Sequence, residues 1–141
     1  MTSRRAMRAQ WKLHKVMWRI SGGRLGNRVV GMPVVELITI GNKSGEPRTI
    51  LISYLDFDGA PTLVATNAGA EHDPAWVRNL RANPDATIVR RGHHRQAVRA
   101  RFLDGEERER AWQTAVAANA QYEHYGAAMS RPIPIVALDA V

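Results

Sequence analysis

The stretch that most constrains this fold is residues 37–52, which read L-I-T-I-G-N-K-S-G-E-P-R-T-I-L-I. Two β-branched runs flank a segment rich in glycine, charge and hydroxyl groups, so the pattern predicts two antiparallel strands joined by a loop. The loop is too long for a tight two-residue turn, and long loops between rigid strands often carry function. The stretch therefore predicts a sheet protein with a candidate binding loop.

This loop has the chemistry of an anion site. Gly41 and Gly45 let the backbone bend with its N–H groups exposed. Ser44 adds a hydroxyl donor, while Lys43 and Arg48 add cations. Donors that converge in this way bind a phosphate or a carboxylate. A plain charged hairpin is the competing interpretation, and the spacing of a Walker A loop is absent.

The whole chain limits the class of protein. Its 141 residues are long enough for one domain with a real core. It contains no cysteine, which excludes disulfides and thiolate metal sites and fits a reducing cytoplasm. No run of about 18 apolar residues is present and no signal-peptide core is found, so a cytoplasmic protein without a membrane span is expected.

The net charge of +7 is confined to the N-terminal arm. Residues 1–28 carry eight cations and no acid, whereas residues 29–141 carry twelve cations and thirteen acids. We therefore expect a basic segment over residues 1–28 and a main domain over residues 29–141. Because that domain is nearly neutral, no nucleic-acid partner is expected.

Residues 4–20 predict a basic amphipathic helix, with Trp11 and Trp18 beside the cationic sector. Such a helix suits an anionic membrane surface, where tryptophan prefers the headgroup zone. This interpretation predicts peripheral attachment to the inner face of the plasma membrane. A helix that packs on its own domain is the alternative.

The rest of the chain predicts an α+β, mainly antiparallel β domain. Six or seven strands would close as a small barrel, accompanied by the N-terminal helix and two further helices. The first of these two helices would begin with Asp73 as N-cap and Pro74 as first residue. The second would run from a capping box of Asp104 and Glu107 to about Asn119. The first three strands would form a meander.

Residues 65–76 form a second informative stretch, in which small residues lead from a strand into a helix. A backbone of small residues can approach a ligand closely, although an ordinary connection would look the same. His93 and His94 are adjacent, so their rings would point to opposite faces of a strand, and no metal site is expected. The usual catalytic motifs are absent, so an enzyme of this kind would rely on a bound cofactor.

Several motifs together resemble the deazaflavin-dependent nitroreductase family. Residues 41–48 are similar to its G-R-K-[ST]-G-Q-P-R motif, and residues 65–76 to its A-S-K-G-G-A-P-x-x-P-x-W segment. Residues 76–80 match its W-x-x-N-L. The closing Y-x-x-Y at residues 122–125 and R-x-I-P-I-V at residues 131–136 also resemble this family.

The resemblance implies a split β-barrel, FMN-binding-like in fold, that binds coenzyme F420, with FMN as the alternative cofactor. Lys43, Ser44 and Arg48 would hold the phosphate and acidic tail. Thr66 would stand near the reacting face, and Tyr122 and Tyr125 would line the substrate mouth, so these three are the implied catalytic residues. The implied cofactor-binding residues are Asn42, Lys43, Ser44, Gly45, Arg48, Thr49, Leu51, Ile52, Thr66, Asn67, Ala68, Trp76 and Asn79.

The implied activity is hydride transfer from reduced F420 to an apolar, electron-poor small molecule such as a quinone or nitro compound. A non-catalytic split barrel that binds a lipid, FMN or haem at a membrane surface is the alternative. A monomer or weak homodimer is expected. Asn42 and Asn67 replace the family's usual arginine and lysine, and Glu46 its frequent glutamine. Each change near the surface would weaken tail binding by about 0.5–1 kcal/mol.

Overall fold

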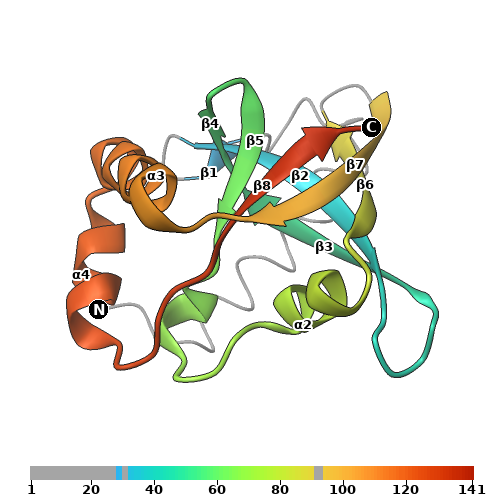
Figure 1. The fold of residues 1–141 in the computed structure, drawn as a ribbon, viewed down its shortest axis with the longest axis horizontal. Coiled ribbons are helices and arrows are strands. Elements are labelled where there is room, and N and C mark those ends of the chain that lie inside the picture. The colour runs from blue at the N-terminus through green and yellow to red at the C-terminus, as the bar shows by residue number, and fades with distance from the viewer. Residues whose placement is uncertain (1–27, 30–31, 91–93) are drawn as a thin grey trace.

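The computed structural model describes residues 28–29, 32–90 and 94–141 of the chain. The expected helix over residues 4–20 and the expected boundary after residue 28 depend on residues outside this described part. Both therefore stay predictions, and so does the orientation of the His93 ring. The described residues contain the rest of the expected domain (Figure 1).

A single antiparallel sheet forms the body of the described domain, in the order β1-β2-β6-β7-β8-β5-β4, with β3 pairing separately with β2. Its strands are β1 (Arg28–Val29), β2 (Met32–Ile40), β3 (Pro47–Ser53), β4 (Leu55–Phe57), β5 (Ala60–Val64), β6 (Asp85–Arg90), β7 (His94–Phe102) and β8 (Ile135–Ala140). Figure 1 shows the sheet curling, with β2 and β3 passing behind β7 and β8. The expected α+β split barrel of six or seven strands is confirmed, since only the two-residue β1 adds to seven longer strands.

Three α-helices and one short 3₁₀ turn accompany this sheet in the described residues. They are η1 (Asn67–Gly69), α2 (Ala75–Ala82), α3 (Gly105–Ala118) and α4 (Gln121–Ala128). The sequence analysis missed α4, because only Tyr122 in it is buried and no apolar stripe marks it as a helix. A Cβ on Gly126 would lie 2.8 Å from Trp112 of α3, so the glycine permits the close approach of the two helices.

The predicted three-strand meander is wrong at Tyr54. The chain turns there, so the expected second strand divides into β3 and β4. The Tyr54 N–H donates to the Pro33 carbonyl at 3.0 Å and so is bonded at this corner. As a result β3 pairs with β2, whereas β4 pairs with β5 across the Asp58-Gly59 turn.

Both predicted helix caps also differ from the structure. Helix α2 begins at Ala75 with Pro74 as N-cap, one residue later than expected, because the Asp73 carboxylate pairs with Arg131 at 2.9 Å instead. Asp104 is the N-cap of α3, as expected, but its side chain makes no capping hydrogen bond. The predicted capping box is therefore not formed, and Glu107 instead accepts a 2.6 Å hydrogen bond from Arg101.

Apolar side chains pack on both faces of the central strands. In β8, Ile135 and Ala137 join one cluster with residues of α3 and α4, whereas Val136 and Leu138 join a second cluster with residues of α2. Successive strand residues point to opposite faces, so β8 is covered on both sides. The helices therefore lie on two sides of the sheet, and α2 is beside the β2–β3 hairpin (Figure 1).

Candidate functional site

The loop between β2 and β3 is a closed turn fixed by its own backbone. The Gly41 N–H donates to the Glu46 carbonyl and the Gly45 N–H to the Gly41 carbonyl, both at 2.8 Å. Gly45 has a φ of +72°, which favours glycine. A Cβ on Gly41 would lie 2.6 Å from Ser44 Oγ. Both glycines therefore serve the shape of this loop.

The loop presents donors to solvent. Ser44 Oγ accepts hydrogen bonds from the Glu46 N–H at 3.1 Å and from Arg48 Nη2 at 3.3 Å, so its own hydrogen stays available for an anion. Lys43 and Arg48 are exposed. No residue in the described part of the chain accepts a hydrogen bond from the backbone N–H of Lys43 or Ser44. This donor set fits a phosphate or carboxylate group.

Asn79 attaches this loop to the rest of the domain. Asn79 is buried, with 5% of its surface exposed, and its Oδ1 accepts a hydrogen bond from the Asn42 N–H at 3.0 Å. Its Nδ2 donates to Thr39 Oγ1 at 3.1 Å, which ties α2 to β2. Trp76 lies in the buried cluster one turn earlier in α2. Asn79 therefore supports the loop from the protein side, while Trp76 packs in the core.

The strand register divides the predicted contacts of β3 between two faces. Leu51 is opposite Glu36, and Ile52 is opposite Val35, which belongs to the core beneath α2. Successive side chains on a strand point to opposite faces, so Leu51 shares a face with Thr49, whereas Ile52 lies on the other face and packs against that core. A single ligand on one face would contact only one of these two sets.

The second predicted loop follows β5 and has an unusual backbone. Thr66 is in the right-handed helical region, and Asn67, Ala68 and Gly69 follow with φ values of +48°, +53° and +84°. Consecutive residues of this kind form a nest in which N–H groups converge on a negative or partly negative atom. Within the described chain, no residue accepts a hydrogen bond from the N–H of Asn67 or Ala68. Asn67 Nδ2 donates to the His72 carbonyl at 3.1 Å.

The two predicted tyrosines of α4 occupy different environments. Tyr125 lies against the second loop, since a Cβ on Gly69 would be 3.4 Å from its ring. Tyr122 is 7% exposed and its hydroxyl donates to Met32 Sδ at 3.7 Å. Burial raises the pKa of the Tyr122 phenol above its ordinary value, although a hydrogen bond with Ser53 acts in the opposite direction. Tyr122 is therefore a neutral core residue beneath the end of β3.

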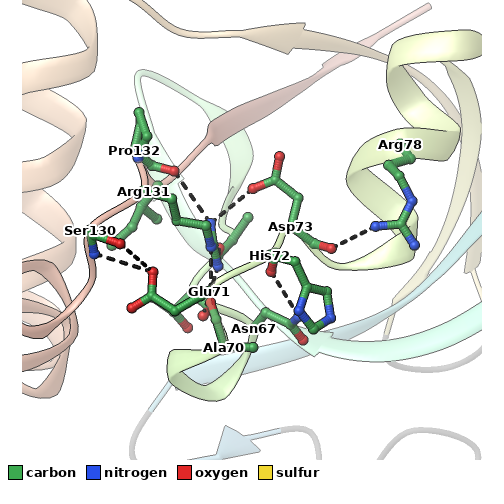
Figure 2. A network of polar contacts seen from close by, with 12 residues as sticks. Asn67, Ala70, Glu71, His72, Asp73, Arg78, Ser130, Arg131 and Pro132 are labelled. Carbon is green, nitrogen blue, oxygen red and sulfur yellow. Dashed lines mark hydrogen bonds and ion pairs between the residues drawn. The ribbon is translucent and has the colours of Figure 1, made fainter.

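The sequence analysis missed Arg131 as a residue of this region. Its guanidinium donates to backbone carbonyls on both sides of the second loop and pairs with Asp73 (Figure 2). The only sequence signal was its place in the closing R-x-I-P segment. Arg131 also lines a pocket of about 540 Å³, together with residues such as Phe102 and Ile133. None of the predicted cofactor-binding or catalytic residues lines this pocket, although Glu71, His72 and Asp73, which follow the second loop, do.

Comparison with known proteins assigns the family. Residues 10–140 match the sequence profile of the F420H(2)-dependent quinone reductase family. The chain belongs to this family. An F420H(2)-dependent quinone reductase of Mycobacterium tuberculosis is 37% identical over 131 residues, covering 90% of this chain and 87% of that relative.

Solved structures agree with this assignment. A structure of an F420-H2 dependent reductase (FDR-A) has a TM-score of 0.68 and 32% identity, covering 76% of this chain and 94% of the other. A structure described as a domain-swapped dimer has a TM-score of 0.70 and 30% identity, covering 94% and 99%. Family membership confirms the expected split-barrel oxidoreductase, its coenzyme F420 and the use of a quinone as small-molecule acceptor.

Proposed function

We propose that this quinone reductase binds F420 across its two loops, with the acidic tail at residues 41–48 and the ring system at residues 66–69. The observation that carries this proposal is the donor set of the first loop, which is held by Asn79 while Lys43, Ser44 and Arg48 still face solvent. A polyanionic tail suits such a set. When bound, the reduced coenzyme supplies a hydride from its C5 atom.

The residues of the first loop would bind the coenzyme tail and orient it. Ser44 donates its hydroxyl hydrogen, Lys43 and Arg48 supply positive charge, and Gly45 keeps the turn open to the tail. Asn42 lies at the same rim, fixed through its N–H by Asn79. This arrangement orients one end of the coenzyme and leaves the other end to the second loop.

The second loop would hold the ring end. The converging N–H groups of Asn67 and Ala68 can donate to a ring carbonyl, and the half-buried Thr66 adds a hydroxyl beside them. Thr49 and Leu51 on one face of β3, or Ile52 on the other, would flank the ring. Tyr125 would wall the acceptor's entrance, while Tyr122 and Trp76 would support the site from the core.

The proposed activity is tested by mixing protein, F420H2 and the soluble quinone menadione without oxygen. We expect the absorbance of oxidised deazaflavin to return at a rate proportional to protein concentration. The same assay with FMNH2 in place of F420H2 tests the alternative cofactor. Faster oxidation of FMNH2, or oxidation of F420H2 that does not depend on protein, would contradict the proposal.

We also propose that residues 4–20 attach the protein to anionic membrane surfaces. The support is the charge partition, with eight cations and no acid in residues 1–28, together with Trp11 and Trp18. Each cation near an anionic surface contributes about 1 kcal/mol. No helix in the described residues is long and apolar enough to cross a bilayer. A quinone acceptor dissolved in the membrane would then be close to the enzyme.

Removal of residues 1–23 tests the attachment. The truncated protein should lose its salt-sensitive sedimentation with anionic lipid vesicles, with neutral vesicles as the control, and keep its melting temperature and F420 affinity. A melting temperature that falls by several degrees would mean that the segment packs on the domain. Analytical ultracentrifugation of the full chain tests the remaining expectation, a monomer or weak homodimer, against the domain-swapped dimer of the structural relative.

A further inference from the structure

We propose that Arg131 is a positioning residue that fixes the turn at residues 65–70, and through it the ring end of the coenzyme. This inference rests on the proposed function of that turn. It assigns to Arg131 no direct contact with the coenzyme or the acceptor. Its role is to hold the backbone that makes such contacts.

The guanidinium of Arg131 spans both sides of the turn (Figure 2). Nη2 donates to the carbonyls of Ala65 and Thr66 at 3.0 and 3.1 Å, before the left-handed residues. Nε donates to the Ala70 carbonyl at 2.9 Å, after them. The side chain is 11% exposed, so these bonds compete little with water. A single rigid group therefore fixes the two ends of the turn at a constant separation.

The turn needs such support because its backbone is unfavourable. Asn67 and Ala68 both have positive φ values, and the second of them is a residue that rarely adopts this conformation. Left-handed residues in succession persist only when the surrounding structure imposes them. Arg131 is the group in the described structure that bonds to carbonyls on both sides of this segment.

Two acidic residues hold Arg131 and its neighbour in place. Arg131 Nη1 donates to Asp73 Oδ1 at 2.9 Å, which places a negative charge beside the buried guanidinium. Glu71 Oε2 accepts from Ser130 Oγ at 2.6 Å and from the Ser130 N–H at 3.4 Å. Two successive residues of the α4–β8 connection are thus bonded to the segment that leaves the turn (Figure 2).

The same contacts link the turn to α4. The connection begins at Met129, the C-cap of α4, whose N–H donates to the Tyr125 carbonyl at 3.0 Å. The Tyr125 ring in turn lies against Gly69. The turn and the proposed entrance for the acceptor are therefore held as one unit, and displacement of Arg131 would disturb both.

Arginine suits this role better than lysine. Its planar fork offers donors in several fixed directions, whereas the lysine ammonium concentrates its donors on one atom at the end of a flexible stem. Arg131→Lys keeps the positive charge beside Asp73 but loses the simultaneous contacts to Ala65 and Ala70. This variant therefore separates the fork geometry from the charge.

The test compares Arg131→Lys with Arg101→Lys as the matched control. Arg101 is also paired, with Glu107 at 2.6 Å and Asp139 at 2.8 Å, but on the outer side of β7 and without contact to the turn. Each protein is measured for melting temperature, for affinity toward F420 and its tail-free deazaflavin core, and for single-turnover oxidation of F420H2 by menadione. Asp73→Asn is a second variant that preserves the shape of the side chain.

We expect Arg131→Lys to lower the single-turnover rate by about 10–100-fold, because small displacements of reacting groups have effects of this size. Its affinity for the deazaflavin core should also fall, while Arg101→Lys should match the parent in both. Asp73→Asn should slow the reaction by about threefold or more, since the guanidinium loses its charged partner. This second variant keeps the test valid if Arg131→Lys does not fold.

A purely structural role would lower the melting temperature and leave the single-turnover rate of the folded protein unchanged. That result, or equal rates in Arg131→Lys and Arg101→Lys, would overturn the inference alone. Parent protein that fails to oxidise F420H2 with menadione would instead overturn the proposed function. The two failures are therefore distinguishable.

Discussion

The two loops of the proposed site are held in different ways. The first, at residues 41–46, is closed by its own backbone, and its charged side chains extend into solvent. The second, at residues 65–70, is fixed from outside by the nearly buried Arg131. Attraction between charges falls gradually with distance, whereas hydride transfer depends on the close approach of two atoms. The contrast suggests that exposed charges on a loop closed by its own backbone suffice for the tail, whereas the ring requires a turn that is held from outside.

Helix α2 is the brace that the two loops share. Asn79, in the second turn of the helix, bonds to Asn42 of the first loop. Asp73, just before the helix, bonds to Arg131 through its carboxylate and to Arg78 through its carbonyl. A change at either end of α2 should therefore affect one loop before the other.

The largest effect on stability is expected for Asn79→Ala. The substitution removes the partners of the Asn42 N–H and of the Thr39 hydroxyl, which belongs to a residue 2% exposed. Unsatisfied groups of this kind should lower the free energy of unfolding by about 2–3 kcal/mol. The control is Asn119→Ala, which removes one exposed hydrogen bond to Gln121. Urea unfolding measures both, and equal losses would contradict a special role for Asn79.

A smaller effect is expected from alanine at the left-handed glycine of each loop. Gly45→Ala meets no atom within 4 Å, so only backbone strain of about 1–2 kcal/mol opposes it. Gly69→Ala has similar strain but also places a Cβ 3.4 Å from Tyr125. We expect comparable losses of stability, with slower F420H2 oxidation only in Gly69→Ala. Slower oxidation in Gly45→Ala at saturating coenzyme would break the proposed division between the loops.

Arg48→Ala should weaken F420 binding by about two- to fivefold at low salt, because an exposed charge contributes about 0.5–1 kcal/mol. The loss should shrink at high salt, where exposed charges are screened. Arg95→Ala, at an exposed position of β7, is the control and should bind F420 like the parent. Fluorescence titration at two salt concentrations measures the effect. An equal affinity of Arg48→Ala and parent for F420 at low salt would contradict the placement of the coenzyme tail at this loop.

The smallest effect concerns the Glu71 contact that follows the second loop. The hydrogen bond from Ser130 lowers the pKa of the Glu71 carboxyl below its ordinary value. A lowered pKa means that the ionised form stabilises the folded state above the ordinary pKa and that this contribution is lost as pH falls through the folded pKa. Ser130→Ala should therefore have a slightly lower melting temperature than the parent near neutral pH. The two melting curves should converge in acid, and a constant difference would contradict this assignment.

Much of the fold was predictable from local sequence patterns. The β-branched runs predicted the β2–β3 hairpin, and the charged glycine loop predicted the donors that the structure presents. Helix α4 was not predictable in this way, because its position depends on the contact between Gly126 and Trp112. The turn at Tyr54 likewise depends on a hydrogen bond to Pro33, distant in sequence.

The candidate site was predictable for side chains that act within one loop, such as Ser44 and Arg48. It was less predictable where a role depends on long-range contacts. Arg131 lies about sixty residues after the turn that it holds, and no local pattern indicates this contact. Tyr122 illustrates the same limit, since its burial results from packing near Met32.

The most direct test of the account is a titration of two variants with two ligands. Arg48→Ala and Arg131→Lys are each titrated at low salt with F420 and with its tail-free deazaflavin core. We expect Arg48→Ala to lower the affinity for F420 but not the affinity for the deazaflavin core. Arg131→Lys should lower the affinity for both ligands by a similar factor. If Arg48→Ala weakens binding of the deazaflavin core as much as binding of F420, the coenzyme is not divided between the two loops. The same conclusion follows if Arg131→Lys leaves binding of the deazaflavin core unchanged.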